Sequence, residues 1–266
     1  MNITPNIHTM IVAAGRGSRF GAAVAKQYTT LNDKTLLQHS VHRLASSTYI
    51  GSCFLVVAAD DQVAKNLAFE LPMHYVIGGK ERWQSVQAGV KAIIDNGADN
   101  SDLIVIHDAA RPAVPIADID EVISAAMLEP YGAILAAPVA DTLKQSKKLS
   151  KMDSSIGSEI APDTVTNIDR SLSSFIDDTV YIDKTVDRSQ MWQAQTPQVF
   201  RVGELSRLLN YVEDQQLDIT DEASAFEHLK LPIRLVAGSR QNIKLTFPED
   251  AILLSAILAT QAHSKL

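Results

Sequence analysis

Short apolar runs alternate with amphipathic stretches along most of the chain. These runs are rich in Val and Ile and are too short for most helices, so the pattern predicts buried strands. They lie at His8–Ala14, Cys53–Ala59, His74–Ile77, Leu103–Ile106, Ala133–Ala137 and Ile233–Val236.

The stretches between these runs have the period of amphipathic helices. In Thr35–Ser46, for example, Leu37, Val41 and Leu44 fall on one face. The same pattern predicts helices at Glu81–Asp95, at Ile116–Met127 and at Phe247–Ala262, the last with Pro248 in its first turn. Alternation of strands and helices predicts an α/β fold: a Rossmann-like, doubly wound, mostly parallel sheet with helices on both faces.

One polar region interrupts this rhythm between about residues 144 and 184. It contains Lys147-Lys148, Ser154-Ser155 and Ser173-Ser174, and it has no clear long period. Short β-like pieces flank it at Ile134–Val139 and Thr179–Ile182. We therefore expect a single domain over residues 1–266 with a protruding β-arm at about residues 139–190, and a tip that is partly disordered.

Composition and charge narrow the class of protein. The chain has 266 residues, 46% of them hydrophobic, which is enough to bury a core. Its formal net charge of −7 argues against broad nucleic-acid binding. Cys53 is the single cysteine and lies in an apolar run, which excludes an intramolecular disulfide and favours a buried strand residue. With no signal peptide or membrane span in the pattern, we expect a soluble, cytoplasmic protein.

A glycine-rich segment follows the first predicted strand. It reads Ala13-Ala14-Gly15-Arg16-Gly17-Ser18-Arg19-Phe20-Gly21, with Lys26-Gln27-Tyr28 shortly after. The spacing fits neither a Walker A loop nor a dinucleotide fingerprint. Glycine backbone beside Arg16, Arg19 and Lys26 nevertheless suits a triphosphate, because N–H groups and cations both bind phosphate. A tight surface turn with solvated cations is the structural alternative.

Other candidate residues come directly after predicted strands, where ligands of doubly wound sheets bind. Asp108 follows Leu103–Ile106, and a carboxylate beside a triphosphate is a candidate Mg²⁺ ligand; a surface pair with Arg111 is the alternative. Gly78-Gly79 end another strand, so Arg82 and Ser85 are expected to face the same ligand from the first helical turn. Asp221 and Glu222 resemble metal ligands, but we interpret them as N-terminal helix residues behind the N-cap Thr220.

An ordered set of motifs resembles one nucleotidyltransferase family, the 2-C-methyl-D-erythritol 4-phosphate cytidylyltransferases. The phosphate loop and the Lys-Gln-Tyr segment belong to this set, and the resemblance covers nearly the whole chain except the arm. The further motifs are Gly78–Arg82, His107–Pro112, Ala137–Thr142, Thr185–Arg188, Gln195–Gln198, Thr220–Ser224 and Asn242–Lys244.

The resemblance implies a reaction and a role for each matching residue. It implies that CTP and 2-C-methyl-D-erythritol 4-phosphate react to give CDP-methylerythritol and pyrophosphate, with Mg²⁺ held by Asp108. His107 is then not expected to act as a general base, because a phosphate monoester nucleophile is already ionised. The implied catalytic cations are Arg19, Lys26 and Lys244. The implied nucleotide-binding residues are Ala13, Ala14, Gly15, Gly17, Gly79, Arg82, Ser85, Asp108 and Ala109.

The acceptor phosphate is assigned by the resemblance to Thr142, Arg188 and Thr196. In the family the arms of two subunits interlock, so the resemblance implies a homodimer with arms exchanged and shared sites. No nucleic-acid or membrane partner is expected. Two features depart from the family: Ala25 stands where a proline usually precedes the lysine, and the arm is longer than usual.

Three other functions remain open at this point. A ribitol 5-phosphate cytidylyltransferase would share the nucleotide motifs and differ in the acceptor pocket. A catalytically inactive nucleotide-binding domain would bind CTP without releasing pyrophosphate. A sugar-nucleotide pyrophosphorylase would use UTP or GTP.

Overall fold

A computed structural model describes residues 4–15, 25–148 and 180–263. The chain divides into two compact units. One is formed by Met1–Ala137 together with Ala194–Leu266, and the other is Pro138–Gln193. The first unit contains the predicted α/β sheet, and the second contains a β-hairpin.

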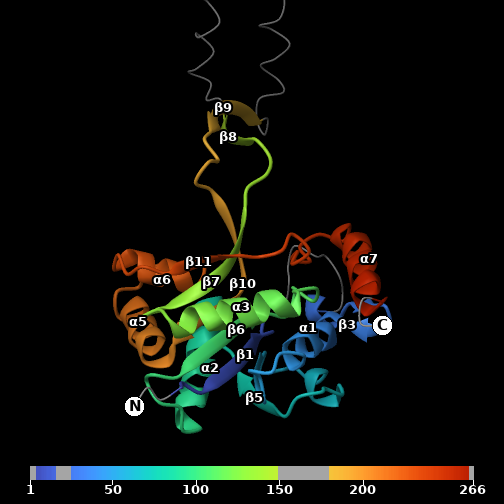
Figure 1. Ribbon diagram of the computed structural model, residues 1–266, viewed down its shortest axis with the longest axis vertical. Helices are drawn as coiled ribbons and strands as arrows, with labels where there is room; N and C mark the ends of the chain where they lie inside the picture. The colour runs from blue at the N-terminus through green and yellow to red at the C-terminus, as the bar shows by residue number, and fades with distance from the viewer. Residues whose placement is uncertain (1–3, 16–24, 149–179, 264–266) are drawn as a thin grey trace, which may run out of the picture. The chain divides into compact units, whose positions relative to one another are not determined.

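The first unit is built on a seven-stranded sheet (Figure 1) with the strand order β11-β7-β10-β6-β1-β4-β5. Its strands are β1 (Ile7–Val12), β4 (Cys53–Val57), β5 (Met73–Ile77), β6 (Leu103–Asp108), β7 (Gly132–Pro138), β10 (Trp192–Arg201) and β11 (Arg234–Ala237). β1 pairs in parallel with both β4 and β6, and β4–β5 and β7–β11 are also parallel. The predicted fold class is confirmed, and each of the six predicted strands lies within two residues of an observed one.

The pattern of hydrophobic positions did not predict β10, which is antiparallel to β6. Its middle residues are polar in sequence but buried in the sheet: Gln195, Thr196 and Gln198 are each less than 7% exposed. Polar side chains hide a buried strand from hydrophobicity patterns, because their burial depends on hydrogen-bond partners elsewhere in the fold.

Helices cover both faces of the sheet, as the alternation predicts. The helices are α1 (Leu36–Ala45), α2 (Arg82–Asp95), α3 (Ile116–Met127), α5 (Val202–Asp214), α6 (Glu222–His228) and α7 (Asp250–His263), with short 3₁₀ turns η2 (Lys26–Tyr28) and η3 (Ala64–Asn66). Apolar residues of α1 and α3 join one buried cluster, which includes Leu37, Val41 and Ile119. Apolar residues of α2, α5 and α6 join a second cluster with Met10 and Phe54 of the sheet.

The C-terminal helix α7 packs away from these two clusters. Its Leu254 and Leu258 contact Leu31 and Leu36, next to the small hairpin of β2 (Thr30–Leu31) and β3 (Lys34–Thr35). Pro248 was expected in the first turn of this helix, but α7 begins two residues later. Asp250 is its first residue, and the Asp250 carboxylate accepts the backbone N–H groups of Thr246 and Phe247. These bonds hold the preceding segment in a turn rather than in the helix.

The second unit contains β8 (Leu143–Lys148) and β9 (Val180–Val186), which pair antiparallel. The predicted pieces Ile134–Val139 and Thr179–Ile182 correspond to β7 and β9. β8 lies almost entirely inside the polar region, at a position where no strand was predicted. The predicted tip, residues 149–179, lies outside the described residues. None of the described residues in this unit is buried. In the described parts of the chain, no helix is long and apolar enough to cross a membrane.

Candidate active site

The candidate site lies where β1 and β6 end side by side. Val12 of β1 is in register with Asp108 of β6, so the segments that follow both strands leave the sheet at the same edge. The chain goes from β1 to β4 on one side and later adds β6 on the other, which makes this edge the topological switch point. Parallel pairing thus brings together two motifs that are almost one hundred residues apart.

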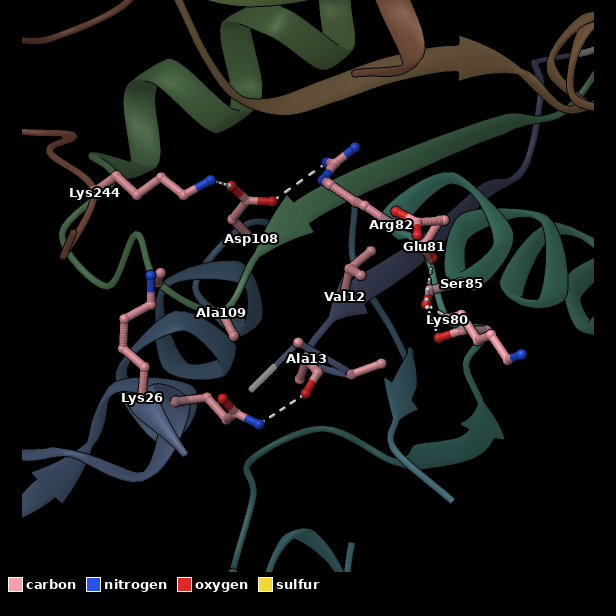
Figure 2. A pocket seen from close by; sticks show the side chains of 15 residues that line it. Val12, Ala13, Lys26, Lys80, Glu81, Arg82, Ser85, Asp108, Ala109 and Lys244 are labelled. Atoms are coloured by element: carbon pink, nitrogen blue, oxygen red, sulfur yellow. Dashed lines mark hydrogen bonds and ion pairs between the residues drawn. The ribbon is translucent and has the colours of Figure 1, made fainter. Parts of the chain in front are cut away.

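A cavity of about 240 Å³ occupies this edge (Figure 2). Most of the residues predicted to bind nucleotide or to catalyse transfer line it. These are Ala13, Ala14, Gly15, Lys26, Gly79, Arg82, Ser85, Asp108, Ala109 and Lys244. Val12, Gln27, Lys80, Glu81 and Ala110 complete the lining. Two other predicted residues, Gly17 and Arg19, lie outside the described residues, as does Arg16.

Lys26 is presented to the cavity by the turn η2 (Figure 2). The next residue, Gln27, is buried, and its Nε2 donates to the carbonyl of Ala13 at 2.8 Å. This hydrogen bond ties the Lys-Gln-Tyr segment to the end of β1. The glutamine therefore fixes the position of the lysine relative to the phosphate loop.

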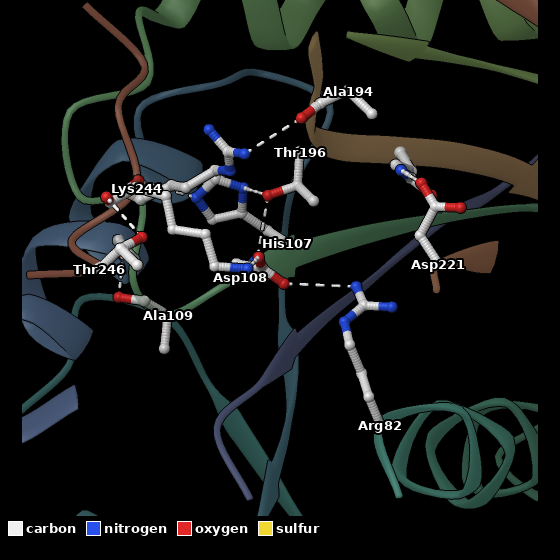
Figure 3. Close-up of polar contacts among 12 residues, drawn as sticks. Arg82, His107, Asp108, Ala109, Ala194, Thr196, Asp221, Lys244 and Thr246 are labelled. Carbon is white, nitrogen blue, oxygen red and sulfur yellow. Dashed lines mark hydrogen bonds and ion pairs between the residues drawn. The ribbon is translucent and has the colours of Figure 1, made fainter. Parts of the chain in front are cut away.

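Asp108 is the charged centre of the site (Figure 3). Its Oδ2 accepts from Lys244 Nζ at 2.6 Å, and its Oδ1 accepts from Arg82 Nη2 at 3.3 Å. Burial by itself would raise the pKa of Asp108, but the charges of Arg82 and Lys244 outweigh it and hold this pKa well below its usual range. The carboxylate is therefore ionised throughout the neutral range.

Arg82 also bonds to a second carboxylate, that of Glu222 at the start of α6. The Glu222 side chain is fully buried, whereas 30% of the Arg82 side chain is exposed. Burial by itself would lower the pKa of Arg82, but the two carboxylates raise it above the ordinary arginine value. Glu222 was interpreted as a helix-terminal residue only, and its partner is 140 positions away in the sequence, so no local pattern could have linked them.

The cap of α6 also differs from the prediction. Asp221, not Thr220, is the N-cap: its carboxylate accepts the backbone N–H of Ser224 at 3.0 Å. Its other oxygen accepts from Gln198 Nε2 of β10. The expected capping role is thus confirmed for Asp221, one residue after the predicted cap, while Glu222 serves as the partner of Arg82.

The two glycines after β5 allow close packing around the cavity. A Cβ at Gly78 would lie 2.7 Å from both Ala14 Cβ and Ser85 Oγ, and a Cβ at Gly79 would lie 2.4 Å from Gln84 Cβ. Ser85 Oγ accepts the Gly79 N–H at 3.1 Å. Glycine is needed here because the segment after β1 and the first turn of α2 approach the backbone closely.

His107 and Thr196 lie behind the site rather than in the cavity (Figure 3). Burial lowers the pKa of His107 to about 4, so its ring is neutral at physiological pH. Its Nε2 lies 3.0 Å from the carbonyl of Arg111, so this nitrogen carries the proton and Nδ1 accepts from the Thr196 hydroxyl. Thr196 Oγ1 in turn accepts the backbone N–H of Asp108 at 3.0 Å.

This hydrogen-bonded chain holds Asp108 from the back. Both ring nitrogens of His107 are used in this chain, so the ring faces Arg111 and Thr196 and not the cavity. The acceptor-binding role of Thr196 stays a prediction, as do those of Thr142 and Arg188. Thr196 lies in the first unit and is 5% exposed. Thr142 and Arg188 are exposed residues of the second unit.

Arg111 does not form the surface pair with Asp108 that was considered as an alternative. Its guanidinium donates to the carbonyls of Asn242 at 2.7 Å and of Ala194 at 3.2 Å. These bonds hold the segment that carries Lys244 against β10. Lys244 itself lies in a loop and not in a strand, with its amine on Asp108.

The donor set at the site suits Mg²⁺. Magnesium takes one or two carboxylates and completes its shell with phosphate oxygens and water. Asp108 supplies one ionised carboxylate beside Lys26, Lys244 and Arg82, and the described residues form no cluster of three or more metal-ligating side chains. A resident all-protein metal cage is thus not found in the described part, but a site shared with phosphate fits the residues present.

A doubly wound sheet that gathers cations around one buried carboxylate at its switch point has the composition of a nucleotidyltransferase site. A model of the 2-C-methyl-D-erythritol 4-phosphate cytidylyltransferase family matches residues 7–155 and 168–260. The chain belongs to this family.

Proteins with this family's name align with the chain over nearly its full length. A 2-C-methyl-D-erythritol 4-phosphate cytidylyltransferase of Psychrobacter cryohalolentis is 66% identical and is aligned over 99% of this chain and 96% of its own. That of Vibrio cholerae is 38% identical, over 96% and 97%. A crystal structure of a 4-diphosphocytidyl-2C-methyl-D-erythritol synthase has a TM-score of 0.73 at 32% identity, covering 96% of this chain and 100% of that one.

Proposed function

We propose that this chain is the enzyme that joins CTP to 2-C-methyl-D-erythritol 4-phosphate and releases pyrophosphate. The observation that carries the proposal is the full-length family match together with its motifs converging on one cavity. The same match argues against an inactive nucleotide-binding domain, since the cavity retains both Lys26 and Lys244 beside Asp108.

The mechanism follows from the charges in the cavity. An acceptor phosphate oxygen attacks the α-phosphorus of CTP, and the bond from that phosphorus to the bridging oxygen of the β-phosphate breaks. Both partners are anionic, so repulsion and positioning dominate the barrier. Lys26 and Lys244 offset this repulsion, and Arg19 is expected to do the same from the phosphate loop. No covalent enzyme intermediate and no general base are needed.

Asp108 would hold Mg²⁺, which when bound would neutralise phosphate charge next to the two lysines. The low pKa of Asp108 keeps this ligand ionised at any physiological pH. Thr196 and His107 keep its backbone in place from behind. The metal is therefore expected to bind together with the nucleotide, since the protein supplies few of its ligands.

A homodimer with exchanged arms is part of the proposal. A two-stranded hairpin is marginally stable by itself, and the second unit exposes several large apolar side chains. Val180 is 57% exposed, Ile182 64%, Met191 43% and Trp192 40%. Another subunit would bury this surface, and Thr142 and Arg188 would then complete a site with the partner.

The decisive experiment measures pyrophosphate release with CTP, UTP, GTP or ATP, combined with either 2-C-methyl-D-erythritol 4-phosphate or ribitol 5-phosphate. We expect efficient release only with CTP and the methylerythritol substrate. Preference for ribitol 5-phosphate would contradict the proposed acceptor. CTP binding without release in any combination would contradict the enzyme function altogether.

A further inference from the structure

A second cavity of about 390 Å³ lies in the first unit, between α1, the β2–β3 hairpin and α7. Figure 1 shows α1, β3 and α7 at the same end of this unit. None of the residues that line the candidate active site lines this cavity. Its lining is Asn32, Lys34, His39, His42, Arg43, Leu258, Ala259, Gln261 and Ala262, a set that contains four basic side chains and no carboxylate.

Arg43 is the notable member of this lining. It is only 8% exposed, and its Nε donates to the carbonyl of Val114 at 2.8 Å. No carboxylate lies within ion-pair distance of it in the described part of the chain, and burial alone lowers its pKa. Arg82, by contrast, pairs with two carboxylates. A buried charge is normally paired with an opposite charge, so a bound anion would supply the partner that Arg43 lacks among the described residues.

The other basic side chains of the lining, those of Lys34, His42 and His39, differ from Arg43 in their partners. Glu70 lies 2.5 Å from His42 Nδ1 and 3.5 Å from Lys34 Nζ, so both of these side chains have a carboxylate beside them. His39 is buried beside Lys34 and Arg43; burial first, and then these charges, lower its pKa, and its Nε2 lies 2.7 Å from the carbonyl of Leu31. Among the described residues, Arg43 is thus a cation of this lining that has no carboxylate beside it.

The α7 side of the cavity is mainly apolar, with Gln261 as its polar member. Leu258, Ala259 and Ala262 of α7 form its apolar part, and small side chains there leave space beside the guanidinium. A cavity of this size, with one cation and an apolar wall, has the composition of a small-molecule site. The charge of Arg43 and the α7 wall together define what it would accept.

We propose that this cavity binds a small organic anion, with a carboxylate or phosphate group on Arg43 and an apolar portion against α7. A planar guanidinium with one N–H already used can still offer two parallel donors to either group. This inference rests on Arg43 and its cavity and is independent of the proposed catalytic function.

The test follows the His39 ring signals by NMR while the full-length protein is titrated, at constant ionic strength, with inorganic phosphate, sodium butanoate or chloride. We expect a saturable shift with phosphate, butanoate or both. If only one of the two saturates the shift, its anionic group, phosphate or carboxylate, is the one that Arg43 prefers. Anion binding at the active site would not disturb a histidine in a different cavity, so the two sites are read separately.

Two variants give the site its controls. Arg43→Gln should weaken the apparent affinity about tenfold or more, as expected for loss of charge-assisted hydrogen bonds. Ala262→Phe should fill the cavity and block binding with Arg43 intact, whereas Arg207→Gln, at an exposed arginine of α5, should leave it unchanged. Equal shifts with chloride would indicate an adventitious ion only. That result, or an unchanged affinity in both cavity variants, would overturn the proposal.

Discussion

At the residue scale, the site is a balance of charge around Asp108. Each of its two carboxylate oxygens bonds to a different cation, and one of those cations is held by a further buried carboxylate. Removing one member of such a network destabilises the protein, because the remaining buried charge then lacks its partner. Changes to individual members should therefore separate catalysis from stability.

Lys26 contributes a charge to the cavity from a short turn. Lys26→Ala should lower kcat/KM by roughly 10²–10³ fold, since a missing cation at a developing negative charge costs a few kcal/mol. Pyrophosphate release measures the rate, and circular dichroism should show an unchanged fold. Lys91→Ala, at an exposed lysine of α2, is the matched control. A wild-type rate in Lys26→Ala would show that the role is wrongly assigned.

Glu222 holds Arg82 from a fully buried position. Glu222→Gln keeps the shape but removes the charge, so we expect a loss of about 3 kcal/mol in the free energy of unfolding and a higher KM for CTP. Urea unfolding and steady-state kinetics measure the two effects. Glu227→Gln, at an exposed position of the same helix, should change neither. If Glu222→Gln behaves like this control, the ion pair does not position Arg82.

His107 should make stability depend on pH. Its folded-state pKa is lowered to about 4 from 6.5, so the unfolded chain takes up a proton first as the pH falls. The free energy of unfolding should therefore decrease between pH 6.5 and 4, by up to about 3 kcal/mol from this residue. Denaturant unfolding across this range measures it. His107→Gln should flatten this decrease; an equally steep one would assign it to other groups.

At the scale of elements, strand ends and helix starts bring the site residues together. β1 and β6 supply the phosphate-loop entrance and Asp108, α2 supplies Arg82, and α6 supplies Glu222. Buried side chains join these elements: Gln27 to β1, and Thr196 of β10 to β6. The hairpin of β8 and β9 has no buried residue among those described.

The apolar side chains of this hairpin give a prediction about assembly. Val180 and Ile182 are two residues apart on β9, so they share a face. Replacing both with serine should shift the proposed dimer to a monomer, measured by analytical ultracentrifugation of the variant beside the unmodified protein. Asp183→Ser on the same strand breaks only an exposed pair with Lys147 and should leave the dimer intact. A double variant that remains dimeric would contradict the exchanged-arm interface.

At the scale of the whole molecule, the described parts of the candidate site belong to one unit. Every residue lining the active-site cavity lies in the first unit, and two of the three predicted acceptor residues lie in the second. The nucleotide cavity and two of the predicted acceptor residues thus belong to different units of the chain. This division can be tested directly.

Removing the second unit should leave a folded nucleotide-binding protein. The N–H of Val139 donates to the carbonyl of Met191 at 3.0 Å, so a linker of about three Gly and Ser residues can replace 139–191. We expect cooperative unfolding and CTP binding to persist, measured by circular dichroism and calorimetry, while turnover is lost. Retained turnover would show that Thr142 and Arg188 are not needed.

The sequence by itself determined six of the seven strands of the sheet, the helices α1, α2, α3 and α7, and most of the cavity lining, but not α5. Apolar runs with a strong period are local signals, and ligands of parallel sheets bind at strand ends, so Asp108 and the phosphate loop could be predicted. The partner of Arg82, the polar strand β10 and the unpaired Arg43 could not. Each depends on contacts between residues far apart in the chain, and only the tertiary structure decides which buried charges and hydrogen-bonding groups meet.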